Sequence, residues 1–300
     1  MGWFDKLVVA SMPLIPKGII KRISQKYIAG ALLDDAVCVT RHLNSIGATA
    51  TIDVLGEFVS SKDRAVHETA TSASVVDAIR SHKLNAYLSI KLTSLGLDID
   101  KEFAFENVRT IVTRARAAGV FVRMDMENTP YTDITLDFYR RLRAEGFTNV
   151  GVVIQAYLHR SEADIRSLLE FRPDVRLCKG IYVESETVAF KNREEIRSNY
   201  KKLLRLLITN GAMVRIATHD EPLIQDAVTL IHEQNILPQD YQFQMLLGVR
   251  EDRRDTLIKA GHPMGIYVPF GDDWYGYSTR RLKENPQIAG YVAKALFTGK

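Results

Sequence analysis

Residues 105–127 read FENVRTIVTRARAAGVFVRMDME. Apolar residues recur at three- and four-residue spacing from Phe105 to Ala118, which predicts a helix with one buried face. Gly119 stands where a left-handed C-cap ends a helix. The run from Val120 to Met124 is rich in β-branched and aromatic residues and predicts a strand. A helix, a glycine stop and a short strand with a polar end are the parts of a parallel β/α fold.

This pattern recurs along the chain. Eight β-rich runs are predicted as strands, at Ala50–Val54, Ala86–Ile90, Val120–Met124, Val150–Ile154, Val175–Cys178, Met213–Ala217, Tyr241–Met245 and Gly265–Val268. The predicted helices between them are Phe105–Ala118, Ile134–Ala144, Glu162–Glu170, Glu194–Thr209 and Pro222–Glu233, and Gly146 and Gly211 follow two of them as C-caps. Eight such units without a Gly/Ser-rich linker favour an α/β fold, a closed (β/α)8 TIM-type barrel, over an open doubly wound sheet.

Residues 1–47 precede the first predicted strand. They read as two or three helices, the last at Asp34–Ser45. We expect them to form an N-terminal helical segment packed on a catalytic barrel of residues 48–300, in a single domain overall. The first 22 residues mix lysines with large apolar residues. Such a segment suits either the outside of a barrel, the reading we favour, or peripheral contact with a membrane.

The composition excludes several classes of protein. The 300 residues are 46% hydrophobic and 25% charged, and the formal net charge of +4 argues against nucleic-acid binding. Only Cys38 and Cys178 are present, far apart, so two reduced thiols in a cytoplasmic protein are expected. The chain has no dinucleotide glycine fingerprint, Walker loop, zincin motif or nucleophile elbow. Asp125, Glu127 and His219 are the best metal-ligand set, and we expect no metal there.

Polar residues stand where the predicted strands end. In a β/α barrel these ends form the catalytic face, so their side chains should converge on one cavity, although any single one could simply face solvent. The residues at these ends are Glu57, Lys91, Asp125, Glu127, Gln155, Lys179, Thr218, His219, Asp220, Gln244 and Asp272.

A further pattern follows the eighth strand. Tyr277 lies three and four residues before Arg280 and Arg281, on one face of a predicted helix. Two arginines can hold a carboxylate with paired hydrogen bonds, and a tyrosine ring can cover the apolar part of a small ligand. Taken alone, this pattern fits a salt-bridged surface helix better than a ligand site. Its place after the eighth strand favours the carboxylate site.

Together these residues carry a resemblance to the proline dehydrogenase family, in its short, single-activity bacterial form. The resemblance runs from about Asp53 to Gln287, with motifs in order along the chain. They are Val54-Leu55-Gly56-Glu57, Ser89-Ile90-Lys91-Leu92, Asp125-Met126-Glu127, Gln155-Ala156-Tyr157, Arg176 to Tyr182, Ala217-Thr218-His219-Asp220, Phe243-Gln244-Met245-Leu246 and Tyr277 to Glu284.

The resemblance implies a distorted barrel with non-covalent FAD. It implies oxidation of L-proline to 1-pyrroline-5-carboxylate, the first step of proline catabolism, with electrons passing to a quinone-type acceptor. A separate pyrroline-5-carboxylate dehydrogenase would then take the product. The quinone would give the N-terminus a reason to touch a membrane.

Residue roles are implied in the same way, each by its position in a motif. Asp125 and Arg176 would be catalytic, and Asp125 would support the substrate side through Lys91. The substrate would contact Lys91, Leu246, Tyr267, Tyr277, Arg280 and Arg281. FAD would contact Met126, Gln155, Arg176, Lys179, Gly180, Ile181, Thr218 and His219. Glu57 would act as a gate, paired with an active-site arginine. Ile181, Leu247 and Cys178 differ from many relatives, and none of these differences removes a charged site residue.

Other functions remain open at this point. A 4-hydroxyproline oxidase would need a larger or more polar wall opposite the arginines, and Tyr277 at that wall favours proline. A non-redox barrel lyase acting on a small carboxylate would need a base and no flavin. A binding protein that kept only the barrel would be expected to lose the charges that this chain retains.

Overall fold

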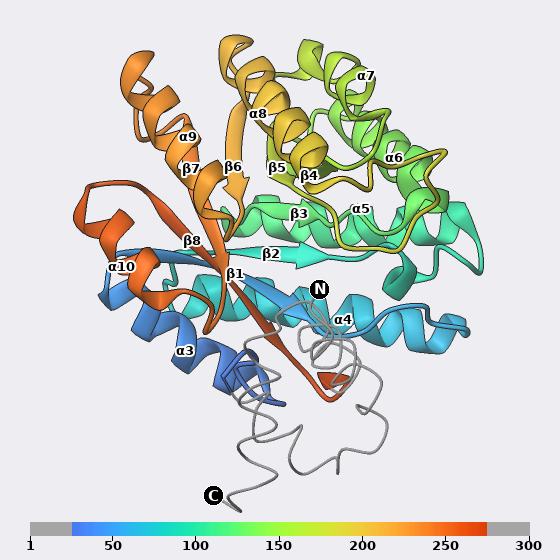
Figure 1. Cartoon of the computed structure of the whole chain (residues 1–300). Helices are drawn as coiled ribbons and strands as arrows, with labels where there is room; N and C mark the ends of the chain where they lie inside the picture. Colours follow the sequence, from blue (N-terminus) through green and yellow to red (C-terminus); the bar gives the residue numbers. More distant parts are fainter. Residues whose placement is uncertain (1–25, 275–300) are drawn as a thin grey trace, which may run out of the picture.

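Eight parallel strands close into one barrel in the computed structural model, which describes residues 26–274 (Figure 1). The strands are β1 (Ala48–Val54), β2 (Ala86–Ile90), β3 (Val122–Met124), β4 (Val150–Gln155), β5 (Asp174–Cys178), β6 (Met213–Ala217), β7 (Tyr241–Leu246) and β8 (Met264–Phe270). Each strand pairs with the next, and β8 pairs with β1. The predicted (β/α)8 barrel is therefore confirmed.

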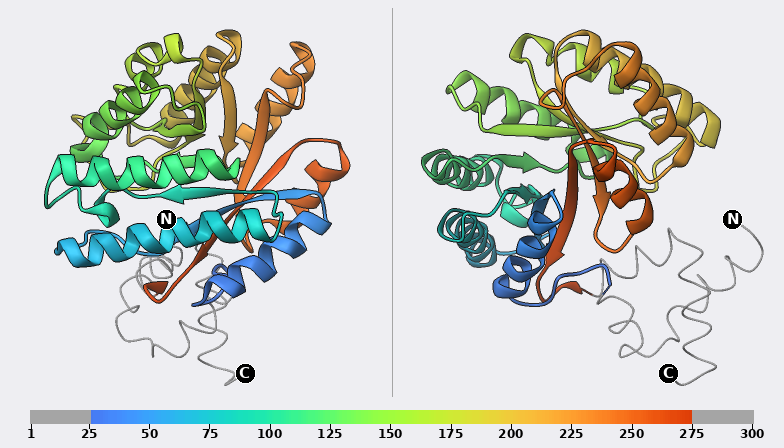
Figure 2. Two further views of the ribbon diagram at one scale, coloured as in Figure 1. Left: turned by 180° about the vertical axis from the view of Figure 1, so that it is seen from behind. Right: turned by 90° about the vertical axis from the view of Figure 1, so that its left-hand side faces the viewer.

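Helices surround the barrel, as the views in Figures 1 and 2 show. They are α3 (Leu33–Ser45), α4 (Lys62–Ser81), α5 (Lys101–Ala118), α6 (Thr132–Ala144), α7 (Ser161–Arg166), α8 (Arg193–Thr209), α9 (Glu221–Glu233) and α10 (Glu251–Lys259). The 3-10 helices η2 (Thr93–Leu95), η3 (Thr129–Tyr131) and η4 (Leu169–Phe171) lie in the connections. Among the described residues, no helix is long and apolar enough to span a bilayer.

Most of the predicted helices agree with the structure, and the glycine stops do as well. Gly119, Gly146 and Gly211 have φ angles of 71°, 82° and 70°, the left-handed conformation that glycine adopts readily. The predicted helix at 162–170 is instead two pieces, α7 and η4. It is interrupted where the Ser167 hydroxyl donates to the carbonyl of Asp164 at 2.7 Å. Helices α4 and α10 were not predicted.

The apolar core lies between the strands and the helices. In β2, Ala86, Leu88 and Ile90 are buried in this layer, and Val108 and Val112 of α5 belong to the same cluster. Burial of each such large side chain contributes about 1.5–3 kcal/mol. Helix α3 packs against β1 and β8. Whether residues 1–47 form a distinct segment stays a prediction, because residues 1–25 lie outside the described part.

The inside of the barrel is polar. Hydrogen bonds there join strands that are not neighbours, so they must cross the interior: Tyr267 of β8 reaches Asp125 after β3, and Arg176 of β5 reaches Gln244 of β7. Branched aliphatic side chains usually fill such barrels. Here buried charges take their place, and a buried charge is stable only when it is paired and hydrogen-bonded.

One paired cluster lies near the start of β5. The Asp174 carboxylate accepts from Arg123 and from Arg215, the latter at 2.8 Å. Arg123 is 2% exposed and also donates to the carbonyl of Val152 at 2.8 Å. Burial raises the pKa of Asp174, but the two arginines outweigh it and hold the pKa below its ordinary value. A Cβ at Gly151 would lie 2.4 Å from Nη1 of Arg123, so glycine there makes room for the guanidinium.

Candidate active site

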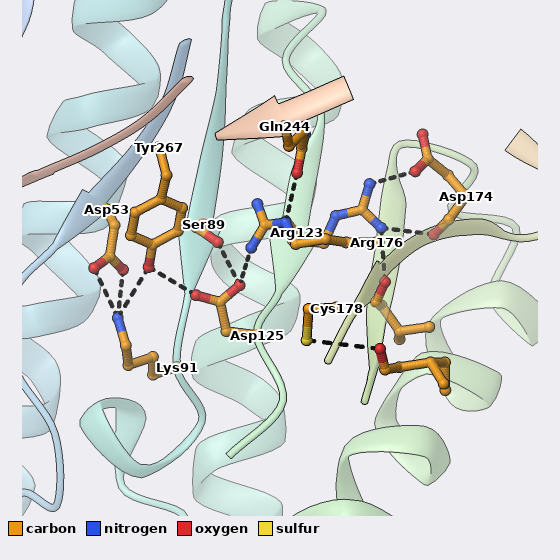
Figure 3. A network of polar contacts seen from close by, with 12 residues as sticks. Asp53, Ser89, Lys91, Arg123, Asp125, Asp174, Arg176, Cys178, Gln244 and Tyr267 are labelled. Carbon is orange, nitrogen blue, oxygen red and sulfur yellow. Dashed lines mark hydrogen bonds and ion pairs between the residues drawn. The ribbon is translucent and has the colours of Figure 1, made fainter. Parts of the chain in front are cut away.

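Lys91 follows β2, and its side chain points toward Asp53 of the neighbouring strand β1 (Figure 3). Its Nζ donates to both carboxylate oxygens of Asp53, at 2.6 and 2.7 Å, and lies 3.4 Å from Oη of Tyr267. Burial lowers the pKa of the Lys91 ammonium, but the charges of Asp53, Asp125 and Glu57 outweigh it and raise the pKa above its ordinary value. Lys91 therefore stays charged at neutral pH.

Asp125 is the centre of the interior network. Its Oδ1 accepts from Ser89 Oγ at 2.7 Å and from Arg176 Nη1 at 2.6 Å, and its Oδ2 accepts from Tyr267 Oη at 2.9 Å. The side chains come from β2, β5, β8 and the end of β3 (Figure 3). Asp125 thus connects to Lys91 through the hydroxyl of Tyr267, and Asp53 is the direct partner of Lys91.

Arg176 lies deeper in the same network. Its Nε donates to Oε1 of Gln244 at 2.8 Å, and its guanidinium carbon lies 5.3 Å from the centre of the Tyr267 ring. The residue is 8% exposed. Asp125 accepts from Nη1, Gln244 accepts from Nε, and the guanidinium lies over the Tyr267 ring. Together these three contacts fix the plane of the guanidinium.

A second group of charges lies on the rim, around the start of α9. Asp220 accepts from Lys179 at 2.9 Å and from Arg197 at 2.7 Å, and Arg193 lies 3.8 Å away. Burial raises the pKa of Asp220, but Arg197 and Lys179 outweigh it and lower the pKa to about 2. Arg197 also pairs with Glu194 at 2.5 Å, so three cations face two carboxylates. One positive charge is left at this rim, which suits an anionic group such as a diphosphate.

The turn that carries Lys179 rests on an aromatic ring. Gly180 has a φ of 107°, and a Cβ there would lie 2.1 Å from Cδ1 of Tyr157. The amide of Tyr157 donates to the carbonyl of Lys179 at 2.8 Å. The turn therefore needs glycine for two reasons, its backbone conformation and its contact with the ring. Ile181, next along the turn, is 42% exposed.

Thr218, His219 and Leu246 form a third local group. Oγ1 of Thr218 accepts from the amide of Asp220 at 3.1 Å. Nε2 of His219 accepts from the amide of Leu246 at 2.9 Å, so this nitrogen carries no proton and the neutral ring has its proton on Nδ1. In the sheet, Leu246 lies opposite Tyr267. The predicted cofactor and substrate residues thus touch along the edge between β6 and β7.

Glu127 and Gln155 are buried beneath the loops of the mouth. The Glu127 carboxylate accepts from both the amide and the hydroxyl of Thr93, and its carbonyl accepts from Nε2 of Gln155 at 2.9 Å. Thr93 in turn accepts from the amides of Phe58 and Val59, each at 3.2 Å. Glu127 therefore anchors the β1–α4 loop. Met126, beside it, is buried.

The loop that Thr93 holds carries Glu57. This residue is half-buried and close enough to Lys91 to raise the pKa of its ammonium. Phe58, the next residue, has a φ of 55°, a conformation that is unusual for a residue other than glycine. The predicted gate residue therefore lies at the mouth. Its role stays a prediction, because Arg280 and Arg281, like Tyr277, lie outside the described residues.

The titration of Glu127 gives a first testable prediction. Burial raises its pKa to about 7 from an ordinary value of 4.5, against the hydrogen bonds from Thr93. The folded protein therefore holds this proton more tightly than the unfolded chain does. The stability that results is complete below the unfolded pKa and is lost as the pH rises through the folded value. Relative to Glu127→Gln, the wild type should lose about 1–3 kcal/mol between about pH 5 and pH 8.

Urea unfolding at a series of pH values measures this difference. Glu102→Gln is the matched control, because Glu102 is an exposed carboxylate paired with Arg141 on the surface. Parallel stability curves for the wild type and Glu127→Gln would contradict the prediction.

Some site residues were not assigned from the sequence. Asp53, Ser89 and Gln242 lie inside strands, and Gln244 was noted only as the polar end of one. Their signal was the alternation of polar and apolar residues along β1, β2 and β7. No cluster of three potential metal ligands occurs among residues 26–274.

The fold and the site together define a β/α-barrel enzyme with a charged interior and cationic groups at the strand ends. Residues 37–294 match the proline dehydrogenase family. The chain belongs to this family.

Individual relatives agree with this assignment. Proline dehydrogenases 1 and 2 of Bacillus subtilis (strain 168) are 38% and 39% identical to it, and the matches cover 91% and 90% of this chain and 90% and 89% of the relatives. Proline dehydrogenase of Deinococcus radiodurans is 33% identical, over 92% of this chain and 91% of the relative.

Solved structures show the same barrel. Proline utilization A from Bdellovibrio bacteriovorus superposes with a TM-score of 0.82 at 26% identity, over 89% of this chain and 33% of that protein. The Bradyrhizobium japonicum protein of the same name has a TM-score of 0.77 at 20% identity, over 90% of this chain and 32% of that one, and supports the fold alone. The chain thus spans about a third of these longer proteins.

Proposed function

We propose that this protein oxidises L-proline to 1-pyrroline-5-carboxylate, with FAD as the cofactor. The observation that carries the proposal is the network of Lys91, Asp125, Tyr267 and Arg176 in the barrel interior and at its mouth, within a chain that belongs to the proline dehydrogenase family. A charged ammonium, a fixed guanidinium and a tyrosine face one another there. These groups suit a small amino acid whose carboxylate needs a cation.

Substrate binding begins with the carboxylate. Lys91 remains protonated, and by family position Arg280 and Arg281 would add a bidentate clamp. Tyr267 and Leu246, which are neighbours across β7 and β8, would cover the ring together with Tyr277. Such a clamp holds the reacting carbon in one orientation, which is a large part of catalysis in a two-reactant step.

The proline amine must lose its proton before its neighbouring C–H bond can break. A buried pocket favours the neutral amine because desolvation penalises the charged form. The groups around Asp125 are already paired with one another, so they do not stabilise an ammonium strongly. We infer that the site binds the carboxylate as an anion and the amine in its neutral form.

The residues at the mouth fit FAD. The cationic rim of Lys179, Arg193 and Arg197 keeps one positive charge that Asp220 and Glu194 do not neutralise, and this charge would favour a diphosphate. When bound, the isoalloxazine would supply the two-electron acceptor. Arg176 would lie beside it as a fixed cation that stabilises negative charge. The other residues that would hold FAD are Met126, Gln155, Ile181, Thr218 and His219.

A simple experiment tests this function. The purified protein should be yellow, and anaerobic L-proline should bleach the flavin absorbance. 4-Hydroxyproline should bleach it more slowly, since Tyr277 would narrow the wall opposite the arginines. A colourless protein that also fails to take up added FAD would rule out the oxidoreductase.

A second prediction concerns the carboxylate clamp. Arg281→Lys should raise KM for proline roughly tenfold or more, because a point charge cannot reproduce two parallel hydrogen bonds. Steady-state kinetics measure this change. Lys283→Arg, on the same segment, is the matched control and should leave KM unchanged. A normal KM in Arg281→Lys would remove this arginine from the substrate site.

A third prediction concerns the gate. We propose that Glu57 pairs with one of the two arginines when substrate is absent, because several buried cations without an anion are unfavourable. Glu57→Ala should then speed both binding and release of proline, by a few-fold at least. Stopped-flow binding of a proline analogue measures both rates. Unchanged rates would show that Glu57 is no gate.

The remaining partners follow from the same proposal. We propose a quinone-type electron acceptor, peripheral membrane contact through the basic and apolar N-terminus, and a separate pyrroline-5-carboxylate dehydrogenase for the product. Co-sedimentation with anionic vesicles, compared for the full chain and a variant lacking residues 1–22, tests the membrane contact.

A further inference from the structure

Two glutamines on β7 point into the barrel next to Arg176. Gln242 and Gln244 alternate with Tyr241, Phe243 and Met245, which are buried on the outer side of the strand. Both amides are buried, with Gln242 3% and Gln244 6% exposed. Nε2 of Gln244 donates to Oε1 of Gln242 at 3.1 Å, and Oε1 of Gln244 accepts from Nε of Arg176 at 2.8 Å.

The two hydrogen bonds of Gln244 depend on each other. A glutamine amide has nearly the same shape when its oxygen and nitrogen are exchanged, so shape alone does not fix its orientation. Nε of Arg176 can only donate, and it therefore needs the oxygen of Gln244. The oxygen of Gln242 accepts from the other end of the Gln244 amide and makes this orientation the favourable one. With the amide reversed, two donors would face each other, and the buried N–H of Arg176 would have no acceptor.

The neighbouring strand leaves space for this pair. Gly265 of β8 lies opposite Gln244 in the sheet, and a Cβ there would lie 2.7 Å from Oε1 of Gln242 and 3.3 Å from Cγ of Gln244. Any other residue at 265 would displace the amides. Glycine here therefore makes room for the glutamines and serves no turn, since Gly265 lies within β8.

We propose that Gln242 and Gln244 are positioning residues for Arg176: Gln242 sets the orientation of the Gln244 amide, and Gln244 sets the direction of the Arg176 guanidinium. Asp125 holds one Nη, Gln244 holds Nε, and the plane of the guanidinium is fixed by both. This inference rests on the proposed function only in taking Arg176 as the cation beside the flavin.

The test compares variants at both glutamines. Gln242→Met removes the acceptor at similar volume, so the Gln244 amide should lose its preferred orientation. Gln242→Met combined with Gln244→Glu should restore the contact, because a carboxylate presents an oxygen to Arg176 in either orientation. Gln242→Glu, which keeps an acceptor and lies opposite Arg215 in the sheet, is the matched control.

The first measurement is hydrogen exchange at Nε of Arg176, followed by NMR on the flavin-containing protein labelled with ¹⁵N-arginine. The signal is assigned by its loss in Arg176→Lys. We expect exchange roughly tenfold or more faster in Gln242→Met, and near wild-type exchange in Gln242→Glu and in the double variant. The second measurement is anaerobic flavin reduction by proline. The limiting rate should fall roughly tenfold in Gln242→Met while KM changes less than about twofold.

The outcomes are distinct. Faster exchange that the double variant reverses supports the inference. Unchanged exchange in Gln242→Met, or faster exchange that the double variant does not reverse, overturns it. If Gln242→Met does not fold, Gln242→Asn replaces it. The asparagine side chain is one methylene shorter, so its oxygen no longer reaches Nε2 of Gln244 and the same results are expected. If proline fails to reduce the wild-type flavin, the proposed function fails, while the exchange measurement still tests the positioning.

Discussion

Asp125→Ala should lower kcat/KM for proline by about 10²–10³-fold, which corresponds to about 3–4 kcal/mol. The Asp125 carboxylate is the shared acceptor of Ser89, Arg176 and Tyr267. Without it, Arg176 is a buried cation left with two neutral neighbours, Gln244 and the ring of Tyr267. Removing one partner of a buried ion pair costs about 3–5 kcal/mol. We expect most of this cost to appear as a lower kcat/KM, because the pair organises the active site.

Anaerobic flavin reduction and steady-state kinetics measure the loss. Asp125→Asn should fall between the wild type and the alanine variant, because its amide keeps one accepting oxygen. Asp98→Ala is the matched control: Asp98 also accepts from a tyrosine hydroxyl, that of Tyr131 at 2.8 Å, but on the surface. Near-normal kinetics in Asp125→Ala would mean that the interior network does not organise catalysis.

The second large effect is expected on stability. Asp174→Ala should lower the free energy of unfolding by about 3–5 kcal/mol, because Arg123 and Arg215 would lose their shared carboxylate inside the barrel. For a chain of this size that is a fall in Tm of roughly 6–10 °C. The loss should be largest near neutral pH. The wild type's advantage from the lowered pKa of Asp174 exists above the unfolded pKa and disappears as the pH falls through the folded one.

Calorimetry of both proteins tests this expectation. Asp133→Ala is the control, because Asp133 is 83% exposed where it pairs with Arg160, and it should change stability by less than about 1 kcal/mol. Adding Arg123→Met and Arg215→Met to Asp174→Ala should recover part of the loss, since the variant then buries no unpaired charge. Equal stability of Asp174→Ala and wild type would show that water or another anion compensates the two arginines.

The fold could be predicted from the sequence because eight similar units repeat one pattern. Helices α4 and α10 were not predicted, for a physical reason. The buried face of α4 is made largely of small or polar residues such as Ala65, Thr69 and Ser72, so its apolar stripe is faint. Helix α10 buries only Leu257. Both helices are held by tertiary contacts more than by a strong pattern of their own.

The residues of the site could be predicted only in part. Lys91 and Asp125 stand just beyond their strands, where a barrel places its chemistry, and the structure brings them into one network. Asp53 and Gln242 lie within strands and were read as parts of β-rich runs. Asp53 accepts from Lys91, which follows the next strand, and Gln242 accepts from Gln244, whose other partner, Arg176, lies on β5. The arrangement that brings these groups together comes only with the closed barrel. A polar residue at every second position was the available signal.

The polar interior also bears on how the protein responds when charge moves within it. Its ammonium, guanidinium and carboxylate groups are already oriented by one another: Asp53 holds Lys91, and Asp125 and Gln244 hold Arg176. In water, dipoles would have to turn before a redistribution of charge could be stabilised. Here few groups are free to turn, so the reorganisation energy should be small and the electrostatic work is done when the chain folds. The barrel interior serves as a solvent whose dipoles are set in advance.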